Sequence, residues 1–302
     1  MTGYRALRGA AIGMVSAVGL LTSTHAFAGE GLFQRTYTTD TTPEGHYEIE
    51  QMVREREGRA FGHYDATDFV SEVEYGVTDK FQIAGYLNTL RMNAKGAPDD
   101  DDPLGVTGFT RHSFSLQSVS AEFIYRLFSP YENQDGWGLA LYFEPAYMVH
   151  DMHNGLNYAG GTMEFETRAI VQKNFFDDRL ILAYNLTLEA ETIRFAGNPD
   201  RNSELDWNNE FGITYRFMPN WFGGFEFRNH NEYGNFTVHE HSVFWMGPVL
   251  HYGGENVWAT LGWLRQVGGT PGYDEDGNYI GGNLFLRSHE LNEVTFKVGV
   301  PL

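Results

Sequence analysis

Long stretches of alternating apolar and polar side chains constrain the fold of this chain more than any other feature of its sequence. The clearest example lies between residues 180 and 191, where one face of an extended segment would carry Leu180, Leu182, Tyr184, Leu186 and Leu188. The opposite face would carry Asn185, Thr187, Glu189 and Glu191. A period of two places neighbouring side chains on opposite faces of a sheet, so this stretch predicts a strand with one apolar and one polar face.

The same pattern recurs along the chain and predicts twelve strands. They fall at residues 45–56, 63–76, 80–92, 114–128, 137–149, 162–175, 179–194, 205–217, 221–231, 241–252, 256–267 and 283–300. Most exceed the about 5–6 residues of an ordinary soluble strand and match the about 9–11 that cross a bilayer obliquely. An even strand number suits a single-chain bacterial barrel. We therefore predict an all-β fold, a transmembrane antiparallel up-and-down β-barrel of about twelve strands.

The expected connections alternate between short and long. Short ones fall at residues 76–80, 129–136, 177–179, 218–220 and 253–256, and longer ones at 93–112, 151–161, 197–204, 232–240 and 268–283, with a shorter turn at 58–62 on the same side. Outer-membrane barrels keep short turns on the periplasmic side and long loops outside. The alternation therefore supports a barrel and assigns its two ends.

A soluble two-sheet sandwich is the alternative fold. It would bury the apolar faces, would need shorter strands, and would not need aromatic residues beside alternate turns. In this sequence Tyr75 and Phe81 flank one short turn, and Phe217 and Trp221 flank another. Amphipathic rings favour the headgroup level of a membrane, so this placement favours the barrel.

The first 28 residues have the organisation of a secretory signal peptide. Arg5 and Arg8 precede an apolar run at residues 10–21, and a small-residue cleavage pattern ends at Ala28. We expect cleavage before Gly29, export to the outer membrane of a Gram-negative bacterium, and one barrel domain over residues 29–302.

The charge balance argues against a nucleic-acid partner. The net charge is -19, and loss of two arginines with the signal peptide takes it to -21. Phosphates need clusters of Lys and Arg, which this sequence lacks. The absence of cysteine fits an exported protein built without a disulfide framework. The expected partners are outer-membrane lipid and lipopolysaccharide, the barrel assembly machinery and periplasmic chaperones during biogenesis, and a small-molecule solute.

If the apolar faces contact lipid, the polar faces line the lumen, which would then be rich in glutamate. The candidate lumen-lining residues, which would set selectivity, are Glu48, Glu50, Glu72, Glu74, Glu122, Arg126, Glu144, Glu164, Glu166, Arg168, Glu189, Glu191, Arg216, Glu226, Arg228 and Arg287, together with Arg54, Glu210, Glu293 and Lys297. An open pore of this kind would favour cations or neutral polar solutes. The same residues could instead form Glu–Arg pairs that fill a narrow, plugged barrel.

The sequence defines no metal site, cofactor or catalytic group. His239 and His241 could share a strand face, and His150 and His153 lie close together, but two ligands do not make a site. The runs Asp99-Asp100-Asp101-Asp102 and Asp274-Glu275-Asp276-Gly277-Asn278 are expected to be a solvated acidic loop and a turn.

A barrel enzyme, either a lipid hydrolase or a protease, is the alternative to a channel. Ser242 beside His241 and Ser113 beside His112 could suggest a hydrolase. Adjacent strand residues point to opposite faces, so neither pair can form a dyad alone. A protease of this type would need clustered Asp and His at the rim, for which Asp151 and His153 are the candidates. We expect no enzyme.

The stretch Gly76-Val77-Thr78-Asp79-Lys80-Phe81-Gln82-Ile83 resembles the periplasmic turn of outer-membrane channel families, such as the group named for the MetA pathway of phenol degradation. The resemblance covers this turn and the general architecture, and points to a poorly characterised family. It implies a channel for small, hydrophobic or aromatic solutes and transfers no site residue. Together with the lumen pattern, it predicts an outer-membrane channel or porin-like protein for passive passage of small solutes or cations.

Overall fold

The computed structural model describes residues 30–98, 108–149, 162–194, 201–270 and 283–302, and most of this part is β-strand. The expected signal peptide, the acidic runs at 99–102 and 274–278, and the residues His150, Asp151 and His153 lie outside the described residues. In the described part, no helix is long and apolar enough to cross a membrane.

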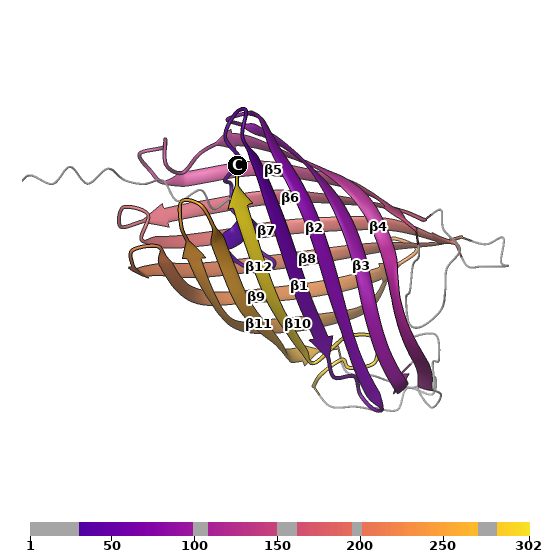
Figure 1. Ribbon diagram of the computed structural model, residues 1–302. Coiled ribbons are helices and arrows are strands. Elements are labelled where there is room, and N and C mark those ends of the chain that lie inside the picture. The colour runs from indigo at the N-terminus through magenta and orange to yellow at the C-terminus, as the bar shows by residue number, and fades with distance from the viewer. Residues whose placement is uncertain (1–29, 99–107, 150–161, 195–200, 271–282) are drawn as a thin grey trace, which may run out of the picture.

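Twelve antiparallel strands form a closed barrel in which each strand pairs with its neighbours in sequence (Figure 1). The strands are β1 (Tyr47–Glu57), β2 (His63–Thr78), β3 (Phe81–Pro98), β4 (Gly108–Phe128), β5 (Trp137–Met148), β6 (Thr162–Phe175), β7 (Leu180–Arg194), β8 (Arg201–Met218), β9 (Trp221–Gly234), β10 (Val238–Gly253), β11 (Trp258–Gly269) and β12 (Asn292–Pro301). Ten register pairs between β1 and β12, from Glu48 opposite Pro301 to Glu57 opposite Asn292, close the ring. The predicted fold class is confirmed.

Side chains alternate between the two faces of the barrel wall. On β11, Leu261 and Trp263 point outward and are 51% and 43% exposed, whereas Thr260 and Gln266 point inward and are 1% and 2% exposed. Large apolar side chains are exposed in the same way on every strand of the ring. An apolar outer surface of this extent suits lipid and not water, as in transmembrane barrels.

The two ends of the barrel differ in their connections. At the end that carries the C-terminus, β8 and β9 are joined by Pro219 and Asn220 alone, and Asn220 has a φ of 64° that the tight turn requires. At the other end, β3 and β4 are the longest pair, with 18 and 21 residues, and extend beyond their neighbours (Figure 1).

Several predicted connections differ from the structure; for example, β3 runs to Pro98 and β4 begins at Gly108, within the loop expected at 93–112. The link expected at 232–240 is a tight turn of residues 235–237, in which Asn235 and Phe236 have φ values of 51° and 62°. The last strand, expected from residue 283, begins only at Asn292. Residues 283–291 leave the wall instead, and Phe285 packs on a buried cluster of Val243, Trp245 and Leu264.

Residues 30–43 lie inside the barrel (indigo in Figure 1), and Glu44 then pairs with Gly76 of β2 at the rim. The segment starts with the 3-10 turn η1 (Glu30–Leu32), and Leu32 and Phe33 pack on inward-facing residues of β7, β9 and β10. A side chain at Gly212 would meet the Phe33 ring at 2.4 Å, and one at Gly262 would meet Gln34 at 2.5 Å. The wall therefore lacks side chains at two points where the segment passes.

Leu188→Arg, near the middle of β7, tests the lipid-facing assignment of the outer surface. We expect it to lower the free energy of unfolding by about 2–4 kcal/mol in lipid vesicles, because a charge near the bilayer midplane is poorly solvated. The matched change Leu127→Arg, beside the turn that follows β4, should cost only about 0–1 kcal/mol. Urea titration of both variants measures the difference, and equal costs would contradict the assignment.

Candidate functional site

A single buried carboxylate holds the start of the N-terminal segment in the lumen. Glu226, on β9, accepts hydrogen bonds from the backbone N–H groups of Gln34 at 3.0 Å, Arg35 at 2.8 Å and Thr36 at 2.6 Å. The Thr36 hydroxyl donates to the same carboxylate at 2.9 Å. Successive backbone N–H groups form an anion-binding concavity, and bonds to an ionised acceptor are stronger than neutral ones. Glu226 is therefore the main anchor of this segment.

Polar side chains from further strands satisfy the rest of the segment. The Asn185 side chain on β7 accepts from the Tyr37 N–H at 2.6 Å and donates to the Tyr37 carbonyl at 3.0 Å. Gln172 on β6 accepts from the Thr39 N–H at 2.8 Å, and Gln82 on β3 accepts from the Thr42 N–H at 2.7 Å. Buried backbone N–H and C=O groups need hydrogen-bond partners. Inward-facing Asn and Gln side chains supply these partners here, as a neighbouring strand would in a sheet. The segment thus crosses the lumen from β9 to β3.

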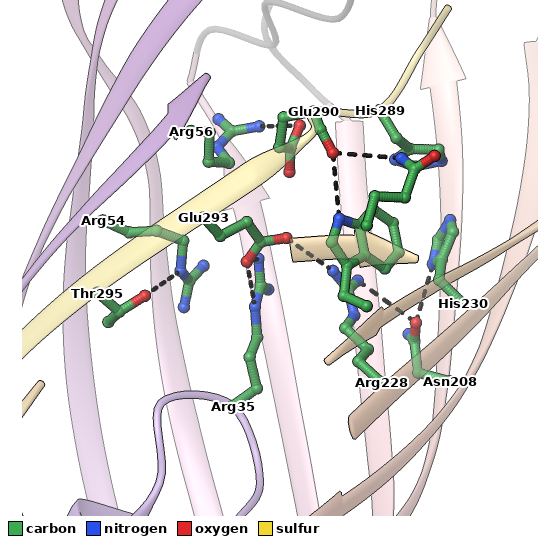
Figure 2. A network of polar contacts seen from close by, with 12 residues as sticks. Arg35, Arg54, Arg56, Asn208, Arg228, His230, His289, Glu290, Glu293 and Thr295 are labelled. Atoms are coloured by element: carbon green, nitrogen blue, oxygen red, sulfur yellow. Dashed lines mark hydrogen bonds and ion pairs between the residues drawn. The ribbon is translucent and has the colours of Figure 1, made fainter. Parts of the chain in front are cut away.

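A cluster of arginines around Glu293 joins the N-terminal segment to β12. Arg35 of the segment contacts Glu293 Oε2 at 2.6 Å, and Arg228 on β9 contacts Glu293 Oε1 at 3.4 Å (Figure 2). Arg54 on β1 lies beside them and donates to Thr295 Oγ1 at 3.4 Å. Glu293 is fully buried. A buried charge is tolerated only when it is paired, so Glu293 and its arginines depend on one another.

Acidic side chains face one another across five consecutive strands. Glu144, Glu166, Glu189, Asp206 and Glu232 are successive register partners on β5 to β9. A second row pairs Glu164 with Glu191 and Glu191 with Glu204. We call these eight residues the acidic wall. Directly opposed like charges destabilise a sheet, so the acidic wall is an arrangement that costs the fold stability.

Arg168, on β6, is a base in direct contact with the acidic wall. It pairs with Glu166, and its Nη1 lies 3.3 Å from Glu210 Oε2. Arg168 also stacks over the Tyr37 ring at 4.2 Å, so part of its role is to hold the N-terminal segment. Arg168 therefore links the acidic wall to the N-terminal segment.

Most of the predicted lumen residues lie on inward positions of the strands. The inward carboxylates outside the acidic wall include Glu48, Glu50, Glu72, Glu74, Glu122, Glu210, Glu226 and Glu293, and Lys297 pairs with Glu50 at 3.4 Å. Arg126 and Arg216 instead bond to backbone carbonyls of Asp79 and Asp177 at the short-turn end. Whether these residues set selectivity stays a prediction.

Two differences from the predicted lumen concern residues outside the strands, because strand periodicity does not describe them. Arg287 is not on β12, where the predicted strand places it, and lies in the inward-folded segment 283–291. The N-terminal segment, with Gln34 to Thr42, is absent from the predicted lumen. Its signal is a polar, threonine-rich stretch that precedes the first strand without alternating.

Adjacent Ser and His residues are predicted to point to opposite faces of a strand, and the burial of their side chains tests this prediction. His241 is buried, while Ser242 next to it is part-exposed and bonds to Asn231 at 2.7 Å. Ser242 Oγ instead lies 2.9 Å from His239 Nε2, because a bulge between His239 and His241 brings the two residues to the same face. Ser113 contacts Arg111 at 3.3 Å.

Glu226→Ala tests the anchoring of the N-terminal segment. The chain has no cysteine, so Thr38→Cys, at a fully buried position, reports on exposure of the segment. We expect thiol labelling of Thr38→Cys to accelerate by at least about tenfold when Glu226→Ala is added, since four hydrogen bonds are lost. Glu191→Ala, which removes an inward carboxylate elsewhere, is the control. Unchanged labelling in the Glu226 variant would contradict the anchoring role.

Asp40 in the N-terminal segment makes its docking sensitive to pH. Burial raises the pKa of Asp40 to about 7, although hydrogen bonds from Thr38 and Tyr131 act in the opposite direction. A raised carboxyl pKa means that the folded state binds more protons, so stability falls as pH rises from about 4 to 7. Urea unfolding at pH 5 and pH 8 should show this loss, and Asp40→Asn should reduce it. Asp135→Asn, at an exposed position, should leave it unchanged; an equal loss in wild type and Asp40→Asn would refute the assignment.

Comparison with solved structures places the fold among outer-membrane barrels. The outer membrane channel COG4313 from Pseudomonas putida F1 is 11% identical, with a TM-score of 0.56 over 87% of this chain and 98% of that chain. The NanC porin is also 11% identical, with a TM-score of 0.43 over 84% of this chain and 98% of that chain. At such identities the likeness concerns the fold alone. No curated protein matches the sequence.

A family match covers almost the whole chain and includes all of the described barrel. Residues 25–302 match a family described as a family of unknown function, DUF6662. The match spans the N-terminal segment, the acidic wall and the closing strand together. The chain therefore belongs to the DUF6662 family.

Proposed function

We propose that this protein is an outer-membrane channel that passes cations or cationic small solutes and that its own N-terminal segment closes. The acidic wall is the observation that carries the proposal. Its carboxylates stand opposite one another on β5 to β9, where a packed ladder of ion pairs would instead have alternated acid and base. Rings of carboxylates are a known basis of cation selectivity in pores.

The apolar outer surface and the closed ring support a location in the outer membrane. A barrel has no free edge, so every strand can satisfy its backbone in lipid. The solved channel of similar fold, COG4313 from Pseudomonas putida F1, is described as an outer membrane channel. The partners that follow from this location are lipid, lipopolysaccharide and, during biogenesis, the assembly machinery with its chaperones.

The N-terminal segment supports a closed resting state. It bonds to side chains on β9, β7, β6 and β3, so it spans the lumen and does not follow one side of the wall. Within the lumen its attachments are mostly hydrogen bonds to side chains and one ion pair with Glu293, and its described pairing with a strand is one bridge at the rim, between Glu44 and Gly76. Such a segment can leave without opening the sheet, because no ladder hydrogen bond of the barrel has to break.

Planar-bilayer conductance with a salt gradient tests selectivity. In the Glu226→Ala background, which frees the segment, we expect discrete cation-preferring steps. Adding Glu164→Gln and Glu189→Gln should lower the cation-to-anion permeability ratio by roughly two- to threefold, since two of the carboxylates that attract cations are neutralised. Glu44→Gln with Glu255→Gln, an equal charge change at exposed positions near the short turns, should have a smaller effect. Anion preference, or no conductance with a freed segment, would refute the channel.

A hydrolytic function is the second candidate, and one contact favours it. Ser242 Oγ and His239 Nε2 lie 2.9 Å apart near the loop end of β10. A serine nucleophile also needs a group that orients the histidine and donors for the oxyanion. The Ser242 N–H already donates to Thr270 Oγ1 at 2.7 Å, so it is not available as an oxyanion donor.

Phospholipid hydrolysis by the purified protein separates the two candidates. We expect none above the rate of a detergent blank. Hydrolysis that disappears in both Ser242→Ala and His239→Gln, but not in Ser113→Ala, would establish the enzyme in place of the channel.

A further inference from the structure

Three histidines and a glutamate converge inside the barrel, near the end that carries the longer connections. His230 and Glu232 lie on β9, His241 lies near the start of β10, and His289 lies in the segment 283–291. Each offers one ligand atom, and the four atoms all lie within 4.8 Å of one another. The residues come from three separate parts of the chain, so their convergence is a property of the fold and not of a local motif.

We propose that His230, Glu232, His241 and His289 bind one divalent transition-metal ion, with Zn²⁺ as the best fit, and that the ion fixes the segment 283–291 to the wall of β9 and β10. Imidazole nitrogen with a single carboxylate oxygen is a ligand set that suits Zn²⁺, and four-coordinate sites of this kind are tetrahedral. The inference goes beyond the proposed channel and does not depend on it.

The distances within the cluster agree with a shared ion. His241 Nε2 lies 2.6 Å from His289 Nε2 and 3.2 Å from Glu232 Oε2, and His230 Nε2 lies 3.8 Å from Glu232 Oε2. Ligand atoms about 2.0–2.1 Å from a tetrahedral zinc ion are about 3.3 Å apart. The three distances lie on both sides of that value, so small side-chain movements would bring the four atoms to an ion.

The surroundings of His230 suit a metal ligand. Its Nδ1 lies 2.8 Å from Asn208 Oδ1, and Figure 2 shows the amide beside the ring. Its Nε2 is buried and has no hydrogen-bond partner among the described residues. If Nδ1 donates to Asn208, Nε2 presents a lone pair to the cluster. A second hydrogen bond of this kind orients most metal-binding histidines, whereas a buried nitrogen left without any partner costs about 1–3 kcal/mol.

The segment that carries His289 is already positioned by its backbone. The Glu290 carbonyl accepts from Trp245 Nε1 at 3.1 Å and from Gln266 Nε2 at 3.2 Å, and the Phe285 N–H donates to Gln266 Oε1 at 2.6 Å. The Phe285 ring stacks on His241 with centroids 4.3 Å apart. A metal ion would therefore meet a preformed site and would add a strong link between this segment and β9–β10.

The acidic wall would also bring metal ions to the site through the lumen. Glu232 is the last member of the first row of the acidic wall, opposite Asp206. Carboxylates along β5 to β9 would concentrate divalent cations near the cluster, because a wall of one charge attracts its counter-ions. The imidazoles would then retain a transition metal and not Ca²⁺ or Mg²⁺, which prefer oxygen ligands.

Zinc binding to the purified, untagged protein in detergent tests the proposal. After chelator treatment and dialysis, titration calorimetry with Zn²⁺ should show one site, and Ca²⁺ should give no heat at that site. His289→Gln should weaken Zn²⁺ binding by at least about 100-fold, as expected for loss of one ligand, and Asn208→Leu by about 10–100-fold. The matched control is His239→Gln, a nearby histidine on the outer face, which should bind zinc as wild type does.

A second readout shows that any loss of binding is specific. His289 is not on a strand, so His289→Gln should retain the heat-modifiable gel migration of a folded barrel. Saturating Zn²⁺ at about 100 times its dissociation constant should stabilise the wild type by about 2.7 kcal/mol and leave His289→Gln unshifted. Absence of stoichiometric zinc in the wild type, or equal binding by His289→Gln and wild type, would overturn the proposal.

Discussion

A closed ring of twelve strands encloses more space than its own inward side chains can fill, and the rest of this structure depends on how that space is occupied. Rings of about eight strands are filled by side chains, and rings of about sixteen leave a wide channel. Here the chain fills the space with two of its own non-strand segments. Residues 30–43 enter before β1, and residues 283–291 fold inward before β12, so both lie next to the pair of strands that closes the ring.

Charge is distributed unevenly around this filled lumen. Arg35 and Arg228 pair with Glu293, and Arg54 lies beside them, on the arc that runs from β9 through β12 to β1. The acidic wall occupies β5 to β9, where carboxylates stand opposite one another in the strand register. Paired charges around Glu293 hold the N-terminal segment, whereas the acidic wall carries the cation selectivity that we propose. The ion pair that anchors the segment and the carboxylates proposed to select solutes therefore lie in different parts of one interior.

The barrel could be predicted from the sequence because the wall of such a fold obeys one rule. A period of two, applied to the segment around Leu182 and Leu188, gives both the strand and its two faces, and the same rule locates all twelve strands. It fails where residues leave the wall. The stretch around Phe285 is apolar enough to be predicted as a strand, but its side chain packs on Trp245 inside the barrel.

The contents of the lumen are harder to predict, since they depend on contacts between residues far apart in sequence. Periodicity identifies Glu226 as inward-facing, but not its partners Gln34, Arg35 and Thr36. Likewise the sequence suggests His241 as a possible ligand with His239, whereas the structure brings it to His230 and His289. No local spacing of residues in the sequence predicts that side chains of β9 and β10 lie close to residue 289.

The position of the N-terminal segment also determines when folding can finish. The segment is the first described part of the chain, yet its partners Glu226 and Glu293 lie 191 and 258 residues beyond Arg35. Contacts so distant in sequence form slowly, because their loop-closure entropy is lost before they contribute. The segment therefore cannot complete its docking until β9 and β12 are in place. The first part of the chain to be made is thus among the last to reach its final position.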